Sequence, residues 1–431
     1  SRRGNGVRSM KIAILTYGSQ GDVEPFVALG HRFCSAGHQV RLAGPEAYHS
    51  HFDLKEIEYV PLPGDPGQLV QDLVDQAGMN RIGMFLSMSK FVIPLAVQVF
   101  ESSRAACRDA DLILHSFLLT STGMALGREL GIPTFSAQLF PVFSATSAFP
   151  APTFPDLPLG GGYRKLTHQL VTQTFKWGSR FLYGRVRKNN PQLPELTAWI
   201  PGDHGNGTTP ILYGFSPHDA PRPVEWGKDV HLTGYWIIDN ESQQEPTRAV
   251  RDFIQGGAPP ITIAFGSTRS KKLEQITHKI LAAVTQLDQR VVLVGQQSAP
   301  GFTSPEILPV DYVPYSWLFK RSAAIIHHGG AGTTARGLMA GVPNIILPFT
   351  SDQPFWGRRV SALGAGPKPL PPRNLTIANL TRAIDQALND QEMRQNADRI
   401  GKQLRKEEGT SQALKVIQEY LDRGKTGDRS C

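Results

Sequence analysis

Short apolar runs recur along this chain, and most of them are followed by a small-residue turn and then a segment with helical spacing. The first run, residues 11–16 (KIAILT), has no polar alternation, which is typical of a parallel strand buried on both faces. After it, Phe26, Leu29 and Phe33 fall on one face of a helix expected over 23–36. Alternating strands and helices predict a doubly wound α/β fold, with ligand sites at the carboxyl ends of the strands.

The strand and helix pattern occurs twice. The predicted strands of the first half are 11–16, 39–43, 111–115 and 133–136, and those of the second half are 260–265, 290–294, 322–326 and 344–348. We expect an N-terminal domain over 10–225, a linker over 226–246, a C-terminal domain over 247–410, and a final helix over 411–425 that could cross back to the N-terminal domain. Two facing sheets of this kind would leave a cleft between them.

Composition narrows the class of protein. The 431 residues are 40% hydrophobic and carry a formal net charge of +8. The basic residues look scattered, without an aromatic-interleaved stripe, so we expect no nucleic-acid partner; the charge suits an anionic ligand or an anionic membrane surface. Cys34, Cys107 and Cys431 have unrelated spacings, which argues against a disulfide framework and fits a reducing cytoplasm. No apolar run is long enough to predict a membrane-spanning helix.

A glycine-rich turn, residues 327–334 (HHGGAGTT), is the strongest candidate for chemistry. It joins the predicted strand 322–326 to a predicted helix over 335–340. The first turn of a helix carries unpaired N–H groups and the positive end of the helix dipole, and glycine lets a phosphate approach closely. We interpret the turn as a diphosphate site, although a plain turn with hydrogen-bonded histidines would have the same pattern.

Three other sets of polar residues follow predicted strands. Asp22 could cap the helix that follows it, act as a general base, or do both. The turn Gly266-Ser267-Thr268 could hold another phosphate oxygen or be only a turn. The pair Asp352 and Gln353 could bind sugar hydroxyls or cap a helix that begins near Pro354. His115 also ends a strand, where a structural role is favoured over a catalytic one.

Two apolar regions, 79–100 and 138–199, lack a clean period and interrupt the strand pattern. Insertions of this kind commonly build an apolar substrate pocket. We therefore expect Phe140, Pro141 and Phe143 to contact an apolar acceptor, and we interpret Gly160-Gly161-Gly162 as a flexible loop.

These motifs resemble those of a known family. The stretches HHGGAGTT, GVP and LPFTSDQPFWGRRV resemble the donor-binding signature of family 1 glycosyltransferases of the GT-B fold. The N-terminal GSQGDVEPFVALG is similar to the GxRGDVxPxxAL loop of the sterol and bacterial natural-product branch. With further matches at 61–66, 213–218 and 231–236, the chain looks most like sterol 3-β-glucosyltransferases. The fold that this implies is two facing Rossmann-like domains with an interdomain cleft.

The resemblance assigns roles to individual residues. It implies that Asp22 is the catalytic base, that His328 contacts the donor's diphosphate, and that Asp352 and Gln353 hold the sugar. The other implied donor contacts are Gly266, Ser267, Thr268, Gly330, Gly332, Thr333 and Thr334. The glutamate that binds ribose in plant members aligns with Arg336, so ribose must be held elsewhere. The plant tryptophan that stacks on uracil has no clean counterpart; Val313 and Trp317 lie near its position.

The resemblance thus implies an inverting transfer of a hexose from a UDP-sugar, UDP-glucose in the first place, to a hydroxyl of an apolar acceptor, in the first place a sterol. A macrolide, flavonoid or other natural product is the alternative acceptor. A nucleotide-sugar epimerase and a non-catalytic binding protein also stay open. We expect a monomer. We also expect no metal, because no DxD-like metal site is apparent, and no cofactor, because the UDP-sugar is a co-substrate. A sterol acceptor would make peripheral contact with a membrane reasonable.

Overall fold

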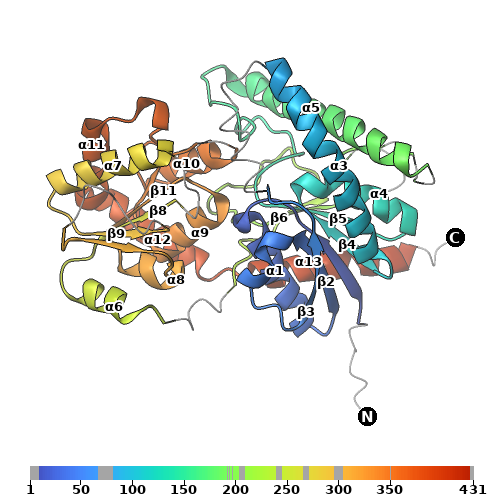
Figure 1. Ribbon diagram of the computed structural model, residues 1–431, viewed down its shortest axis with the longest axis horizontal. Helices are drawn as coiled ribbons and strands as arrows, with labels where there is room; N and C mark the ends of the chain where they lie inside the picture. The colour runs from blue at the N-terminus through green and yellow to red at the C-terminus, as the bar shows by residue number, and fades with distance from the viewer. Residues whose placement is uncertain are drawn as a thin grey trace, which may run out of the picture.

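Two parallel sheets lie side by side and are each covered by helices (Figure 1). The computed structural model describes residues 9–66, 81–191, 193, 195–196, 198–202, 209–238, 245–265, 271–295, 304–349 and 351–427, with the backbone alone at 81–93, 189, 271–272 and 424–427. Each sheet has its own buried apolar core.

The first sheet has seven parallel strands in the order β3-β2-β1-β4-β5-β6-β7. The strands are β1 (Lys11–Leu15), β2 (Gln39–Pro45), β3 (Ile57–Leu62), β4 (Leu112–His115), β5 (Thr134–Gln138), β6 (Ile211–Tyr213) and β7 (Val230–Leu232). Its helices are α1 (Gln20–Ser35), α3 (Arg81–Cys107), α4 (Thr120–Leu130) and α5 (Gly160–Asn189). The order in which strands are added to the sheet reverses between β1 and β4, and doubly wound sheets bind ligands at such a point.

The second sheet has five parallel strands in the order β10-β9-β8-β11-β12. The strands are β8 (Ile261–Ala264), β9 (Val291–Val294), β10 (Ile307–Val310), β11 (Ala324–His327) and β12 (Asn344–Ile346). The helices of this half are α6 (Arg248–Gln255), α7 (Lys271–Gln286), α8 (Tyr315–Leu318), α9 (Ala331–Ala340), α10 (Gln353–Ala362), α11 (Ile377–Asn389) and α12 (Gln391–Leu404). The order in which strands are added to the sheet reverses between β8 and β11. The glycine-rich turn after β11 therefore lies at the edge where such sheets bind ligands.

The predicted α/β class and parallel sheets are confirmed, while one local prediction was wrong. Residues 160–162, expected to form a flexible loop, are the first turn of the 30-residue helix α5. There, tertiary packing outweighed the local pattern.

The apolar region 79–100 lies largely in α3. β7 lies inside the predicted linker 226–246, so that segment contributes an edge strand to the first sheet.

The last helix, α13 (Gly409–Gly427), returns to the first half and packs along α1 (Figure 1). Ala413, Leu414 and Ile417 are buried in the same apolar core as the strands β1 and β4. The ring of Tyr420 meets Phe135 edge to face, with 5.1 Å between ring centroids. The chain therefore crosses between its two halves a second time.

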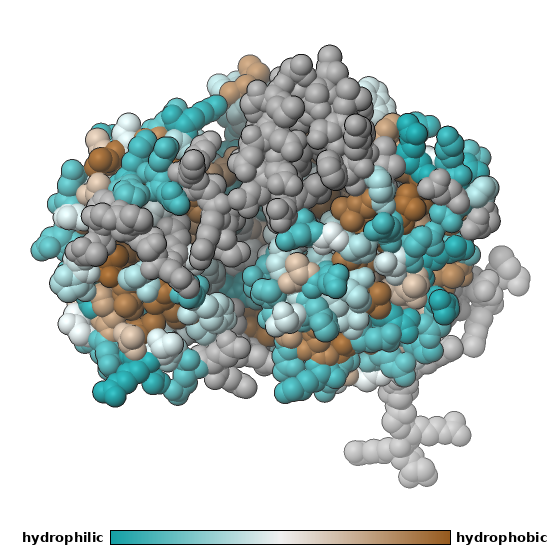
Figure 2. Space-filling model, in the orientation of Figure 1, coloured by the Kyte–Doolittle hydropathy of each residue, from teal (hydrophilic) through white to brown (hydrophobic). Residues whose placement is uncertain are grey.

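The surface is mixed in character. On the face shown in Figure 2, apolar and polar side chains are interspersed over both halves. Within the described part of the chain, every helix is too short or too polar to cross a lipid bilayer.

We predict that Ile417→Ala lowers the free energy of unfolding of the N-terminal half by roughly 2–5 kcal/mol, because it leaves a cavity in a core that has no route to solvent. Urea denaturation would measure it. Lys415→Ala, in the same helix but with a side chain that is 67% exposed, is the matched control and should change stability by less than about 0.5 kcal/mol. Equal losses in the two variants would show that α13 is not part of this core.

Candidate active site

Asp22 lies in the first turn of α1, directly after β1 at the carboxyl edge of the first sheet. It forms a capping box with Ser19, whose backbone N–H and hydroxyl donate to Asp22 Oδ2 at 2.7 and 2.8 Å. Gly18 is required here, since its φ is +147° and a Cβ atom would lie 2.5 Å from that oxygen. Burial raises the pKa of Asp22, and the two hydrogen bonds from Ser19 oppose that rise. Capping uses Oδ2, so Oδ1 is left to act elsewhere.

Asp352 occupies the matching position in the second half, at the start of α10 after β12. Its Oδ2 accepts a hydrogen bond of 2.8 Å from the indole N–H of Trp356. Burial, and then the negative charge of Asp22, raise the pKa of Asp352 to about 6. The two carboxylates are therefore close enough to repel each other, although they come from different sheets.

Gln353 follows Asp352 and shapes the loop before it. Its side-chain carbonyl oxygen accepts a hydrogen bond of 2.8 Å from the backbone N–H of Phe349. Ser351, between them, has a φ of +58°, in the left-handed region. The hydrogen bond to Phe349 and the left-handed backbone of Ser351 therefore fix the residues on either side of Asp352.

The two adjacent histidines of the glycine-rich turn have different environments. His327 is fully buried: its Nε2 lies 2.9 Å from Asn344 Oδ1, and its Nδ1 accepts the N–H of Gly329 at 3.1 Å. It is a structural residue with both ring nitrogens used, and burial lowers its pKa to about 3. His328 is partly exposed, and its Nδ1 is buried without a hydrogen-bond partner in the described structure. Burial lowers the pKa of His328 to about 4, so the ring is neutral at pH 7.

The turn itself has the backbone geometry expected of a phosphate site. Gly329 has a φ of +89°, and a Cβ atom there would lie 2.6 Å from Ile346 Cγ2, so only glycine fits. Gly330 is the N-cap of α9, and Gly332 and Thr333 lie partly exposed in its first turn. Thr334 is fully buried, and its hydroxyl lacks a partner among the described residues. Buried polar atoms without partners are costly unless a ligand satisfies them.

Arg336, which departs from the plant signature, reaches across the domain boundary. It forms an ion pair with Glu24, and the two side chains are 9% and 18% exposed. Glu24 lies on α1 only two residues after Asp22, and Arg336 lies on α9, whose first turn is the glycine-rich turn. The pair therefore ties the helix that carries Asp22 to the helix that carries the predicted diphosphate site. Separated by 312 positions in the chain, the two could not be matched from sequence.

The remaining predicted donor residues have different outcomes. Gly266, Ser267 and Thr268 lie outside the described residues. Val313 was a candidate for the nucleotide base, but its side chain is buried in the core with Leu318 and cannot stack on a ring. Trp317 is partly exposed, and the guanidinium of Arg321 lies 4.2 Å from its ring centroid. Trp317 stays a prediction for the base.

The predicted acceptor residues Phe140, Pro141 and Phe143 line one cavity, which holds about 450 Å³ of empty space including its open mouth. Asp352 and Ser351 form part of its wall, so the aromatic residues of the first half meet the loop of the second half there. Phe143 has a φ of +64°, uncommon for a bulky residue, and its ring packs 4.9 Å from that of Phe175.

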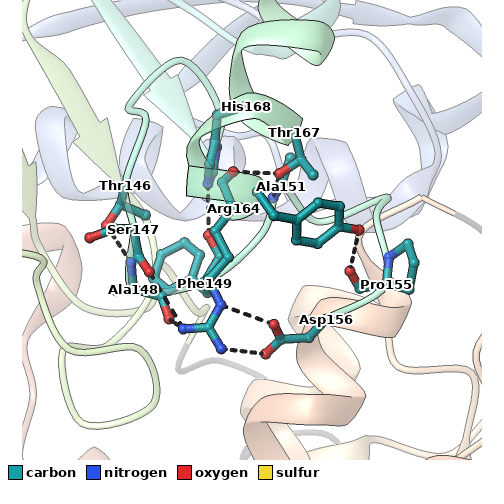
Figure 3. Close-up of polar contacts among 11 residues, drawn as sticks. Thr146, Ser147, Ala148, Phe149, Ala151, Pro155, Asp156, Arg164, Thr167 and His168 are labelled. Carbon is teal, nitrogen blue, oxygen red and sulfur yellow. Dashed lines mark hydrogen bonds and ion pairs between the residues drawn. The ribbon is translucent and has the colours of Figure 1, made fainter. Parts of the chain in front are cut away.

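Three residues of α5 complete the cavity wall and were missed from sequence: His168, Val171 and Thr172. Their spacing of three and four residues is the helical signal, which the surrounding apolar residues obscured. Hydrogen bonds tie α5 to the segment 146–156 (Figure 3). Arg164 pairs with Asp156, and the His168 ring Nε2 lies 3.0 Å from the carbonyl oxygen of Phe149.

His115 is a core residue, as the sequence favoured. It is fully buried at the end of β4 against Gly123, and burial lowers its pKa to about 3. In the described part of the chain, no group of His, Cys, Asp and Glu side chains is arranged to hold a metal ion.

Two family models match the chain. The Glycosyltransferase family 28 N-terminal domain matches residues 12–146, and the Erythromycin biosynthesis protein CIII-like C-terminal domain matches residues 278–414. The first match includes β2 to β5 and Asp22, and the second includes β9 to β12, the glycine-rich turn and Asp352.

Among similar proteins, the O-mycaminosyltylonolide 6-deoxyallosyltransferase of Streptomyces fradiae is 33% identical, over 96% of this chain and 98% of its own. A sterol 3-beta-glucosyltransferase of Arabidopsis thaliana is also 33% identical, over 96% of this chain. One from Emericella nidulans is 32% identical over the same share. This chain spans 66% and 30% of the lengths of these two sterol enzymes.

Solved glycosyltransferase structures share the fold at low identity. The kitacinnamycin glycosyltransferase has a TM-score of 0.71 at 19% identity, covering 96% of this chain and 99% of that one. The glycosyltransferase VinC, solved in complex with dTDP, has a TM-score of 0.64 at 18% identity, covering 96% of this chain and all of that one. These matches confirm the predicted GT-B arrangement of two facing Rossmann-like domains. The chain belongs to the GT-B glycosyltransferases, with a family 28 N-terminal domain and an EryCIII-like C-terminal domain.

Proposed function

We propose that this protein transfers a hexose, with UDP-glucose as the donor, to a hydroxyl group of an apolar acceptor, and that the acceptor is a sterol. One observation carries the proposal: Asp22 and Asp352 lie at the edges of different sheets, the negative charge of Asp22 raises the pKa of Asp352, and Asp352 lines the aromatic cavity. A base, a sugar-binding carboxylate and an apolar acceptor site are then adjacent. The sterol glucosyltransferases among the relatives support the acceptor class.

In the proposed reaction, the acceptor hydroxyl gives its proton to the Asp22 carboxylate while its oxygen attacks the anomeric carbon of the donor. The bond from that carbon to the diphosphate oxygen breaks, and UDP leaves. Attack opposite the leaving group inverts the configuration, so an α-linked donor gives a β-glycoside. The raised pKa of Asp22 makes it a stronger base than an exposed aspartate.

The leaving diphosphate would be held by the glycine-rich turn. The N–H groups at the start of α9 and the positive end of its dipole stabilise the negative charge that develops on the leaving oxygen. His328 is neutral at pH 7 and can donate one ring N–H to a phosphate oxygen. Asp352 and Gln353 would bind hydroxyl groups of the sugar and so fix the anomeric carbon between the diphosphate and Asp22.

A natural-product alcohol is the second candidate acceptor. One relative that matches over nearly its whole length is named O-mycaminosyltylonolide 6-deoxyallosyltransferase. The aromatic residues of the cavity suit a macrolide as well as a sterol.

The proposal predicts that the protein, incubated with UDP-glucose and a sterol, releases UDP and forms a sterol glucoside that mass spectrometry detects. Asp22→Asn should reduce kcat by roughly a hundredfold to ten-thousandfold, because general base catalysis is lost. Asparagine can still accept the hydrogen bonds of Ser19, so folding should be preserved.

Calorimetric binding of UDP to Asp22→Asn is the control and should match that of the unchanged protein. Wild-type turnover in this variant would overturn Asp22 as the base. Conversion of UDP-glucose to another UDP-hexose without acceptor would indicate an epimerase. A rise in melting temperature with UDP, but no UDP release with any sterol or macrolide, would indicate a binding protein.

The pH dependence should follow Asp22. Because the active form is the carboxylate, kcat/KM should rise with pH through the pKa of Asp22, which gives an acidic limb in the pH profile. Burial raises the pKa of Asp22, so this limb should lie at higher pH than for an exposed aspartate. Ser19→Ala removes one hydrogen bond that favours the carboxylate, so the limb should move to higher pH. Ser35→Ala, at the other end of the same helix, should leave the limb in place. A shift to lower pH in Ser19→Ala would contradict this assignment.

The ion pair between Glu24 and Arg336 should set the position of Asp22 relative to the donor. We predict that Glu24→Gln reduces kcat by roughly tenfold or more with a smaller change in the donor's KM, since small displacements of catalytic groups cost this much. The charge-swapped double variant Glu24→Arg/Arg336→Glu should recover part of the loss. Asp398→Asn breaks an exposed ion pair with Lys402 and serves as the control. Steady-state kinetics that show wild-type kcat in Glu24→Gln would refute a positioning role.

A further inference from the structure

Helix α5 carries a stripe of exposed apolar side chains. Leu166, Leu170, Trp177 and Phe181 are 50%, 48%, 70% and 42% exposed. They are four, seven and four residues apart, which places them along one side of the helix. Scattered exposed apolar residues are normal on a protein surface, but an aligned set that includes a tryptophan marks an interaction surface.

Two more apolar side chains are exposed just before the helix. Leu157 and Leu159, just before α5, are 41% and 63% exposed. In Figure 1, α5 lies along the outer side of the N-terminal half, beside α3.

The charges on α5 are all of one sign. Its 30 residues include no Asp or Glu and seven basic residues: Arg164, Lys165, Lys176, Arg180, Arg185, Arg187 and Lys188. Arg180, Arg185 and Lys188 are exposed, and the guanidinium of Arg185 lies 5.3 Å from the ring centroid of Phe181. Basic residues thus flank the apolar stripe. This arrangement of basic residues could not be recognised from the sequence, because it depends on residues 160–189 being helical.

We infer that the exposed side of α5 docks on the surface of an anionic lipid bilayer. Trp, Phe and Leu side chains lying along one side of a helix can enter the boundary between headgroups and acyl chains. The long arginine and lysine side chains can then reach the lipid phosphates, each adding attraction to anionic lipid. A second copy of this chain is a poorer occupant, because two basic helices would face and repel each other.

The opposite side of the same helix lines the acceptor cavity. His168, Val171 and Thr172 form part of its wall, so α5 separates the cavity from the proposed lipid surface. An acceptor that partitions into membranes would then be close to the cavity when the protein is docked. This last step rests on the proposed function, whereas docking itself does not.

The test is sedimentation of the full chain with vesicles of phosphatidylcholine alone and of phosphatidylcholine with phosphatidylserine, without donor or acceptor. We expect binding to the anionic vesicles that weakens with added salt and weak or no binding to the neutral ones. Trp177→Ser/Phe181→Ser should weaken binding by more than about tenfold, since two aromatic side chains no longer enter the bilayer. Arg180→Glu/Arg185→Glu should also reduce it. Val224→Ser, which removes a side chain 95% exposed elsewhere, is the matched control and should bind as before.

Three results would overturn the inference. The first is failure of the unchanged protein to bind anionic vesicles, and the second is equal binding by Trp177→Ser/Phe181→Ser. The third is a concentration-dependent dimer in sedimentation velocity that this variant abolishes, because the stripe would then serve a second copy of the chain. Melting temperatures of all variants show whether they fold. Because the assay contains no sugar donor, its outcome is independent of whether the proposed transfer occurs.

Discussion

The approach of Asp22 and Asp352 from separate sheets is the constraint on which the rest of the site depends. Two carboxylates held close together in a partly buried place repel each other, and neither half of the protein can bring them together alone. The contacts that hold the halves in this arrangement must therefore offset that repulsion. The ion pair between Glu24 and Arg336 joins α1, which carries Asp22, to α9, which begins at the glycine-rich turn. It therefore helps to hold the two halves together close to the site.

A second set of contacts joins the halves away from the two aspartates. Asp219, after β6, is fully buried; its carboxylate accepts from the hydroxyl of Tyr235, and its backbone oxygen accepts from Arg359 Nε at 2.6 Å. Nearby, Ser216 donates to Glu407 at 2.6 Å, just before α13 crosses back. Burial raises the pKa of Asp219 to about 7. Together with α13, these buried polar contacts connect the two halves near the points where the chain passes from one to the other.

Segments of both halves are needed to enclose the cavity. The phenylalanines of the wall come from the segments after β4 and β5, α5 adds His168, Val171 and Thr172, and Asp352 comes from the loop after β12. The sheets supply rigid edges, while the segments between strands supply the shape of the pocket. Changes in those segments could therefore alter the acceptor without disturbing the carboxylates or the glycine-rich turn.

The sequence by itself determined the two-fold repeat of strands and helices, because buried parallel strands are continuous apolar runs whatever surrounds them. It also marked Asp22, the glycine-rich turn and Asp352, since each follows such a run at a small-residue turn. Only the tertiary structure decided which of two adjacent histidines is structural: His327 is buried against Asn344, and His328 keeps a buried nitrogen without a partner. It also decided that Arg336 pairs with Glu24 and that α5 has one side on the cavity and one exposed. Those facts depend on residues far apart in the chain or on the direction in which a helix faces, and no local pattern contains either.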